Sequence, residues 1–390
     1  MPQTILIIGG YGNAGMAIAD LLLQTTDTQI LIAGRDLARA KAGALALCAK
    51  FGTGRAQALQ LDVSRHDRLD AAFRQARVVV IASSTMADTE AIAKAALANK
   101  CRYMDIQLSS PKKLAVLRSL QSQIADAKLT FITDGGFHPG MPGAMIRHAA
   151  SYFDALQRAE VASLLRVNWR DVQISPETKL EFVQELMHTR QLVFEQGEWR
   201  TQRFRDAPKF DFGLPFGRQW CVPMFLEELH RLPGKIPALQ RAGFFISGFG
   251  GFIDFVIFPA VMVLLKLAPE KALHLAAKWL YWGLRTFSHP PYRSLLLLEA
   301  TGMKSGKPHH LRMTVSHENA YWLTAAPVVA CLCQLLEKSP EPGGLWCQAE
   351  YVDTERFLQI YSALVSTSIL NLSIRVELPN NLIDRYRNER

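Results

Sequence analysis

The sequence predicts an α/β protein, in which a doubly wound parallel sheet at the N-terminus is followed by a second, α+β domain. From residue 4 to about residue 134, short apolar runs alternate with longer helical patterns, which is typical of a parallel sheet covered on both faces. After Gly135 this alternation ends and prolines become frequent. The chain of 390 residues is long enough for more than one hydrophobic core, so we expect two domains.

Six strands and four helices are expected in the first domain. The apolar runs predict strands over residues 5–8, 29–33, 56–61, 78–82, 102–105 and 129–133. Segments rich in Ala, Leu, Lys and Gln, with apolar positions three and four residues apart, predict crossover helices over residues 13–23, 37–51, 87–99 and 112–127. Six strands with such helices complete a doubly wound domain.

The second domain shows fewer clear elements. Its pattern predicts a helix near residues 144–152 and a strand over residues 158–167. It also predicts a hairpin of residues 295–301 and 309–316, because Gly302, Ser305 and Gly306 between them favour a turn.

Charge and cysteine content narrow the class of protein. The net charge of +9 comes from 44 basic residues scattered along the chain, which argues against nucleic acid as a partner and suits an anionic dinucleotide or an acidic membrane surface. The six cysteines have neither CxxC spacing nor a histidine pair at zinc spacing, so we expect no metal site. No cleavable signal peptide precedes the first strand, so we expect a cytoplasmic protein.

Residues 244–267 carry only Asp254 and Lys266 as charges. Gly248, Gly250 and Pro259 interrupt the segment, and its uninterrupted part is shorter than the roughly 20 apolar residues of a membrane span. Three interpretations remain open: a core or oligomer contact, a peripheral membrane or lipid-binding surface, and a true span, which the interruptions disfavour.

Residues 10–15 read GYGNAG, a GxGxxG pattern directly after an apolar strand and at the start of a helix. This context is typical of a Rossmann dinucleotide-binding loop. Gly10 is expected to permit the tight turn, Gly12 to let the backbone approach the pyrophosphate, and Gly15 to let the helix pack on the strand. Tyr11 and Asn13 lie in the same loop, so we expect all five to bind the cofactor. The alternative is a glycine-rich turn that binds nothing.

The second strand ends in Gly34, Arg35 and Asp36, about 20 residues beyond the glycine loop. At this place an acidic residue favours the ribose hydroxyl of NAD, and an arginine favours the 2′-phosphate of NADP. Because Arg35 comes first, and Arg39 follows one helical turn later, we favour NADP over NAD. Asp36 is then explained as the N-cap of the next helix.

Three further residues are candidates for cofactor binding. Asp62 closes the third strand, where it can contact the adenine edge or cap the following turn. Ser83 and Ser84 follow the fourth strand beside the glycine loop.

Hydride transfer requires an acid or base for the accompanying proton, which we expect after the fifth and sixth strands. Asp105 ends the fifth strand, and His138 lies in the glycine- and proline-rich segment 134–143 after the sixth. His138 titrates near neutrality when unperturbed. The alternatives are that His138 only forms structural hydrogen bonds and that Asp105, like Asp134, only caps a strand end. No tyrosine has a lysine four residues later, so the short-chain dehydrogenase dyad is absent.

Four stretches together resemble the saccharopine dehydrogenase family: ILIIGGYG at 5–12, AGR at 33–35, YMD at 103–105 and GFHPG at 136–140. Weaker similarities follow at 210–213 and 321–325. The resemblance implies NADP-linked chemistry at a carbon bearing an amine or imine. The family commonly has aspartate where this chain has His138, which argues for a different substrate. The apolar segment from Phe244 resembles the saccharopine dehydrogenase-like branch, whose members have no settled substrate.

The resemblance also implies that the second domain is inserted before a C-terminal return to the first. We therefore expect a dinucleotide-binding domain of residues 1–135 with a return helix at about 325–338, and a substrate or dimerisation domain of residues 136–324 and 339–390.

Our leading hypothesis is an NADP-dependent oxidoreductase, in homodimeric form, that acts on a C–N or carbonyl group of a small or lipophilic substrate. The alternative is a non-catalytic, dinucleotide-bound scaffold or redox sensor associated with membrane or lipid. That alternative is motivated by the absent dyad and by the apolar segment.

Overall fold

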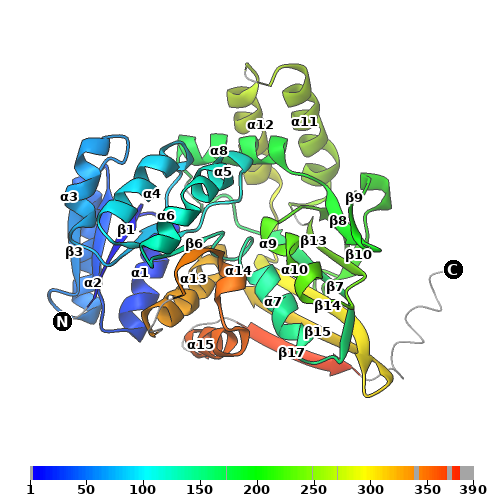
Figure 1. Cartoon of the computed structure of the whole chain (residues 1–390). Coiled ribbons are helices and arrows are strands. Elements are labelled where there is room, and N and C mark those ends of the chain that lie inside the picture. Colours follow the sequence, from blue (N-terminus) through cyan, green and yellow to red (C-terminus); the bar gives the residue numbers. More distant parts are fainter. Residues whose placement is uncertain are drawn as a thin grey trace. The chain divides into compact units, whose positions relative to one another are not determined.

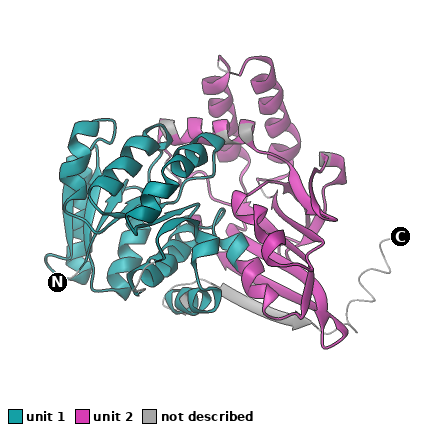
Figure 2. Ribbon diagram, viewed as in Figure 1, with its two compact units in different colours: residues 1–144, 321–368 teal, residues 145–320, 369–390 magenta. Residues whose placement is uncertain are grey.

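The chain forms two units in the computed structural model, which describes residues 3–172, 174–247, 249–269, 271–337, 342–366 and 371–377. Unit 1 comprises residues 1–144 and 321–368, and unit 2 comprises residues 145–320 and 369–390 (Figure 2). Unit 1 thus includes residues 136–144 and 342–366, which we expected in the second domain. Gly248 and residues 378–390, named in the expectations above, lie outside the described residues.

Unit 1 contains a parallel sheet of seven strands in the order β16-β6-β5-β4-β1-β2-β3 (Figure 1). The strands are β1 (Thr4–Ile8), β2 (Gln29–Gly34), β3 (Ala56–Gln60), β4 (Val78–Ile81), β5 (Arg102–Asp105), β6 (Thr130–Thr133) and β16 (Gly344–Cys347). The strand order reverses between β1 and β4, which is where doubly wound sheets bind their ligands. The six predicted strands are confirmed, whereas β16 is an addition to them, because four residues after a long insertion carry little pattern.

The helices of unit 1 connect these strands and pack on the sheet. They are α1 (Asn13–Thr25), α2 (Leu37–Phe51), α3 (Leu69–Phe73), α4 (Thr89–Ala98), α5 (Pro111–Ser119), α6 (Gln121–Asp126), α13 (Ala320–Glu337), α14 (Gln348–Tyr351) and α15 (Thr354–Ser366). The helix predicted over residues 112–127 is divided at Leu120 into α5 and α6. Helix α7 (Met141–Ala150) begins three residues before the predicted start and runs from unit 1 into unit 2.

Helix α13 contains the return helix that the family resemblance implied. Within the described parts of the chain, it is the one helix long and apolar enough to cross a membrane. Its apolar window is 67% buried, as in the core helix of a globular unit.

Unit 2 is built on an eight-stranded sheet in the order β17-β15-β14-β7-β13-β8-β9, with β12 paired to β13. Its strands are β7 (Ala155–Arg166), β8 (Leu192–Glu195), β9 (Glu198–Thr201), β12 (Val222–Pro223), β13 (Arg241–Ser247), β14 (Arg293–Lys304), β15 (Lys307–His317) and β17 (Asn371–Glu377). The predicted hairpin is confirmed as β14 and β15, which turn through Ser305 and Gly306, both at positive φ. A separate pair is formed by β10 (Lys209–Asp211) and β11 (Arg218–Trp220).

The helical part of unit 2 comprises α8 (Pro176–His188), α9 (Glu227–His230), α10 (Leu232–Lys235), the π-helical turn η4 (Ile253–Ile257), α11 (Phe258–Leu267) and α12 (Leu273–Phe287). The apolar segment 244–267 is therefore two different structures. Its beginning is the buried strand β13, and its end is η4 and α11, which form a helical hairpin with α12 (Figure 1). A single span over this segment is ruled out, because its first four residues, 244–247, are hydrogen-bonded within the sheet.

Candidate functional site

The glycine loop connects β1 to α1 in unit 1. The amides of Gly9 and Gly10 both donate to the carbonyl of Ala33, at 2.9 and 3.2 Å, which fixes the loop against β2. Gly9 is at φ +80°, a conformation that favours glycine. The tight turn that we assigned to Gly10 is therefore made by Gly9.

Steric contact explains the other glycines of the loop. A Cβ on Gly10 would lie 2.8 Å from the carbonyl oxygen of Ile7, and a Cβ on Gly15 would overlap the carbonyl oxygen of Gly9 and lie 2.7 Å from the Cα of Gly10. Gly15 thus allows the close packing of helix on strand that we expected of it. Gly12 is the N-cap of α1, and a Cβ there meets one atom at 3.1 Å, so this position has the most room of the three.

Helix α1 presents its N-terminus to the loop. No acidic side chain lies in its first turn, and no side chain caps it, because the N-cap is Gly12. Backbone amides and the helix dipole together attract an anion at such a terminus. The loop therefore has the form of a pyrophosphate cradle, with Asn13 as the first residue of the helix.

Tyr11 joins the glycine loop to the end of β2. Its ring lies against Gly34, where a Cβ would overlap the ring, and its hydroxyl accepts a hydrogen bond from the Asp36 amide at 3.1 Å. The guanidinium of Arg39 lies over the same ring, 4.7 Å from its centroid. Tyr11 and Arg39 thus link the glycine loop to the start of α2.

The turn after β2 has exposed charges in the arrangement that suits a 2′-phosphate. Asp36 is the N-cap of α2, since its Oδ1 accepts from the Arg39 amide at 3.1 Å. Its carboxylate is therefore engaged as the sequence suggested. Arg35 and Arg39 are both exposed beside it.

Asp62 and the two serines differ in where they lie. Asp62 accepts from the amide and hydroxyl of Ser64, at 3.1 and 2.8 Å, which supports the turn-capping alternative. The Ser64 hydroxyl is the main reason that the pKa of Asp62 is lowered. Ser83 lies against the glycine loop, because a Cβ on Gly9 would be 2.8 Å from the Ser83 Cβ, and Ser84 beside it is exposed.

Gln107 is a polar residue of this edge that the sequence analysis missed. Its side-chain amide donates to the Ser83 carbonyl at 2.7 Å and so links the loops after β4 and β5. Its only sequence signal is its place two residues after a predicted strand.

A buried ion cluster lies where β5 and β6 end. The ammonium of Lys113, in the first turn of α5, is 2.9 Å from Asp105 and 3.0 Å from Asp134, and it also donates to the Gln107 carbonyl at 2.8 Å. All three charged side chains are 0% exposed. Tyr103 completes the cluster by donating to Asp105 at 3.0 Å.

Charge balance governs protonation inside this cluster. Burial alone would lower the pKa of Lys113, but the attraction of Asp105 and Asp134 outweighs it and raises that pKa well above its ordinary value. Burial and the nearby Asp105 likewise raise the pKa of Tyr103. Both oxygens of the predicted catalytic Asp105 are therefore engaged within the protein.

The segment after β6 is held by a residue from beyond the insertion. Gln348, in α14, accepts from the Gly136 amide at 3.1 Å. Gly136 and Gly140 have φ values of +124° and +113°, and a Cβ on Gly140 would lie 2.6 Å from the Gln348 side-chain nitrogen. The sequence analysis missed this contact because the two residues lie far apart in the chain.

His138 lies half-buried in the same segment, with its ring 4.8 Å from that of Phe137. Removal of the imidazole from water lowers the pKa of His138 to about 4. Burial therefore moves the pKa of His138 below neutrality, which favours the neutral imidazole at pH 7.

Among the residues that the structure describes, no group of three or more His, Cys, Asp or Glu side chains is placed to hold a metal ion.

The parallel sheet, the glycine loop and the arginines after β2 define the class: the protein is an NAD(P)-dependent oxidoreductase. Residues 5–132 match the family model described as the saccharopine dehydrogenase NADP binding domain. This domain of the chain is thus similar to the NADP-binding domain of that family, and the cofactor is NADP, as the sequence indicated.

A solved structure shares the fold over most of the chain. Apo saccharopine dehydrogenase (L-Glu forming) from Saccharomyces cerevisiae is 16% identical, with a TM-score of 0.68 over 96% of this chain and 100% of that one. A myo-inositol dehydrogenase from Corynebacterium glutamicum is 12% identical, with a TM-score of 0.44 over 97% of this chain and 100% of that one. No curated protein sequence matches the chain.

Proposed function

We propose that this oxidoreductase transfers hydride between NADP(H) and a carbon that bears a nitrogen or oxygen, in an amine and imine pair or in a carbonyl compound. One observation carries the proposal. The strands of unit 1 are parallel, so the loops after β1, β4, β5 and β6 share one edge of the sheet. A dinucleotide on the glycine loop extends along this edge toward the later strands.

His138 is the residue of this edge that we propose for proton transfer. When imine is reduced, NADPH supplies hydride to carbon and a proton is added to nitrogen. A neutral imidazole of low pKa donates a hydrogen bond to the substrate nitrogen or oxygen, as neutral histidine does in polarising a carbonyl. The N–H proton passes to the product through that hydrogen bond as the second ring nitrogen takes up a proton from solvent, so the imidazole is neutral before and after the step.

Asp105 has a different role in this proposal. Its oxygens bind Lys113 and Tyr103, so it orients the end of β5 rather than touching substrate. We therefore propose it as a positioning residue.

Replacing Arg35 by alanine tests the cofactor assignment. We expect NADPH affinity to fall about 10-fold to 100-fold, because a hydrogen bond to a charged group contributes about 1.5–3 kcal/mol. NADH affinity should hardly change, since NADH has no 2′-phosphate. Fluorescence titration measures both, and Arg74→Ala, at an exposed site elsewhere in unit 1, is the control. Equal losses for the two dinucleotides would contradict the assignment.

Replacing His138 by glutamine tests the proton-transfer role. We expect the rate of NADPH oxidation with an imine or keto acid to fall about 10²-fold to 10⁴-fold, with NADPH affinity unchanged. A group with a pKa of about 4 does not titrate between roughly pH 6 and 8. The wild-type rate should then show no His138-dependent inflection in that range. An inflection near neutrality that disappears in the variant would contradict the neutral imidazole.

A second function is supported by the apolar side chains exposed on α11 and α12. The protein is then a dinucleotide-bound scaffold or redox sensor on a membrane or lipid surface. Tight NADPH binding without reduction of any imine, keto acid or enoyl compound would favour this function over hydride transfer.

A further inference from the structure

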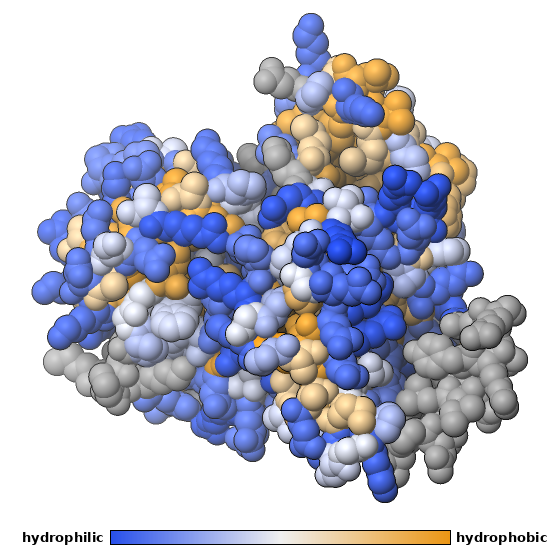
Figure 3. Space-filling model, turned by 45° about the vertical axis from the view of Figure 1, so that its right-hand side comes forward, coloured by the Kyte–Doolittle hydropathy of each residue, from blue (hydrophilic) through white to orange (hydrophobic). Residues whose placement is uncertain are grey.

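The helical hairpin of residues 249–269 and 271–287 exposes large apolar side chains along one stripe. From the N-cap of η4 through α11 the exposed residues recur at helical spacing, and α12 continues the stripe from the opposite arm: Phe252, Phe255, Val256, Val263, Leu267, Leu275, Trp279 and Trp282. Leu267 is 79% exposed and Trp282 is 55% exposed. Figure 3 shows apolar residues gathered over this hairpin. A patch of this kind marks an interaction surface.

The surface of helix α12 has three faces, which are buried, exposed and apolar, and basic. Ala276, Leu280 and Leu284 are buried against α8 and α11. Leu275, Trp279 and Trp282 form the exposed apolar face. The third face, with the sequence spacing 274, 278, 281 and 285, is basic and aromatic. The hydrophobic and basic faces are neighbours, which is typical of helices that lie in a membrane interface.

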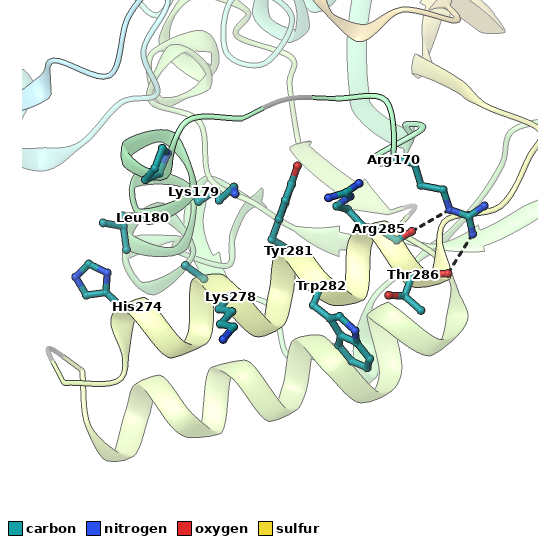
Figure 4. Close-up of a pocket in the computed structure, with 11 residues that line it drawn as sticks. Arg170, Lys179, Leu180, His274, Lys278, Tyr281, Trp282, Arg285 and Thr286 are labelled. Carbon is teal, nitrogen blue, oxygen red and sulfur yellow. Dashed lines mark hydrogen bonds between the residues drawn. The ribbon is translucent and has the colours of Figure 1, made fainter.

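A pocket of about 680 Å³ lies between α12 and α8 on the basic face (Figure 4). Its basic lining consists of Arg170, Lys179, Lys278 and Arg285 together with His274, and no lining residue is acidic. Trp282 lines the pocket and also belongs to the apolar stripe. A group that enters the pocket is thus adjacent to whatever covers the stripe.

The cations of the pocket are held in place without carboxylates. The ammonium of Lys179 lies 3.9 Å from the centroid of the Tyr281 ring, and the Tyr281 hydroxyl donates to the Val172 carbonyl at 2.9 Å. Arg170 donates to the carbonyls of Arg285 and Thr286, at 3.1 and 3.3 Å. In the described part of the chain, no carboxylate forms an ion pair with the lysines or arginines that line this pocket. Their charge is available to an external anion.

Two occupants of this surface, a second copy of the chain and a lipid bilayer, differ in the charge that they present to it. In a symmetric dimer the same patch faces its own copy, so cations such as Lys278 would approach each other. A bilayer with anionic lipid presents the complementary charge, and its interface accepts tryptophan.

We propose that this hairpin docks on an anionic lipid bilayer, with the apolar stripe in the interface and a lipid phosphate group in the basic pocket. The inference does not depend on hydride transfer, because all of its residues lie in unit 2.

Sedimentation of the full-length protein with vesicles tests the proposal. We expect at least tenfold stronger binding to vesicles of phosphatidylglycerol and phosphatidylcholine than to phosphatidylcholine alone, and weaker binding as salt is raised. The double variant Trp279→Glu, Trp282→Glu should lose binding at least tenfold. Lys278→Gln should weaken binding to the anionic vesicles about fivefold, as expected for one cation near such a surface.

Two matched controls separate this surface from the rest of unit 2. Trp220 is 47% exposed against 46% for Trp279, and Lys307 is exposed like Lys278. Trp220→Glu and Lys307→Gln should bind vesicles as the wild type does. NADPH titration of every variant shows that unit 1 is intact, so a failure here is distinct from a failure of the proposed function.

Several outcomes would overturn the proposal. They are absence of vesicle binding by the wild type, equal binding to both vesicle types, and wild-type binding by the hairpin variants. Conversion of a dimer to a monomer by Trp279→Glu would assign the surface to a second copy of the chain. Saturation of the pocket by inorganic phosphate, with no vesicle binding, would assign it to a free anion.

Discussion

Replacing Lys113 by methionine is expected to destabilise unit 1 by about 3–5 kcal/mol, because it leaves two buried carboxylates without their cation. Asp105 and Asp134 are both 0% exposed and lie within 3.0 Å of the ammonium. The loss of stability is measured as a shift of the midpoint of urea unfolding, and a spectroscopic signal from bound NADPH reports that transition. Lys112→Met, at the exposed neighbouring position, is the control and should leave the midpoint unchanged.

The same cluster predicts a pH dependence of stability. The folded-state pKa of Lys113 is raised above its unfolded value, so its contribution is fully present below about pH 10.4 and is lost as the pH rises through the folded value. The wild type should therefore lose stability in strong alkali more steeply than Lys113→Met does. Adding Asp105→Asn and Asp134→Asn to that variant should recover part of the lost stability. No recovery would mean that packing, rather than charge, explains the loss.

Replacing Gly15 by alanine is expected to abolish measurable NADPH binding and to destabilise the apo protein by about 1–3 kcal/mol. The new Cβ would overlap backbone atoms of Gly9 and Gly10, which have no flexible side chain to move aside. The loop must therefore shift, and the amides that face the pyrophosphate shift with it. NADPH titration and thermal unfolding of the apo protein measure the two effects.

Gly12→Ala in the same loop provides the comparison. A Cβ on Gly12 meets only the Gly9 carbonyl oxygen, at 3.1 Å, so apo stability should change by less than about 1 kcal/mol. NADPH binding should still fall, because the methyl group occupies the space over the helix terminus where the pyrophosphate approaches. Equal destabilisation by the two alanines would contradict the steric roles given to these glycines.

The fold of unit 1 was predictable because its signals are local. Buried parallel strands such as β1 and β4 are continuous apolar runs, and helix α2 has its expected bounds since Asp36 and Gly52 mark its two ends. Strand β16 was not predictable, because its pairing with β6 joins residues separated by the whole of unit 2. The short strands of unit 2 were missed for a related reason, since antiparallel pairs of three or four residues show no clear alternation.

In the candidate site too, features that depend on neighbouring residues were predictable, and contacts between distant residues were not. The glycine loop, Arg35 and the capping role of Asp36 follow from residues close in sequence. The buried partners do not: Lys113 appears as one of two adjacent lysines in an amphipathic helix, and nothing local shows that it faces Asp105 and Asp134. The shifted pKa of His138 depends on burial that the sequence does not report.

The position of β16 has a consequence for synthesis of the protein on the ribosome. The first six strands of the cofactor unit emerge early, but β6 has an unpaired edge until residues 344–347 are translated, after all of residues 145–320. Gln348, which holds Gly136, emerges at the same late point. A nascent chain therefore carries an open sheet edge at β6 while residues 145–320 are synthesised, and the sheet of the cofactor unit, begun first, is completed only after them.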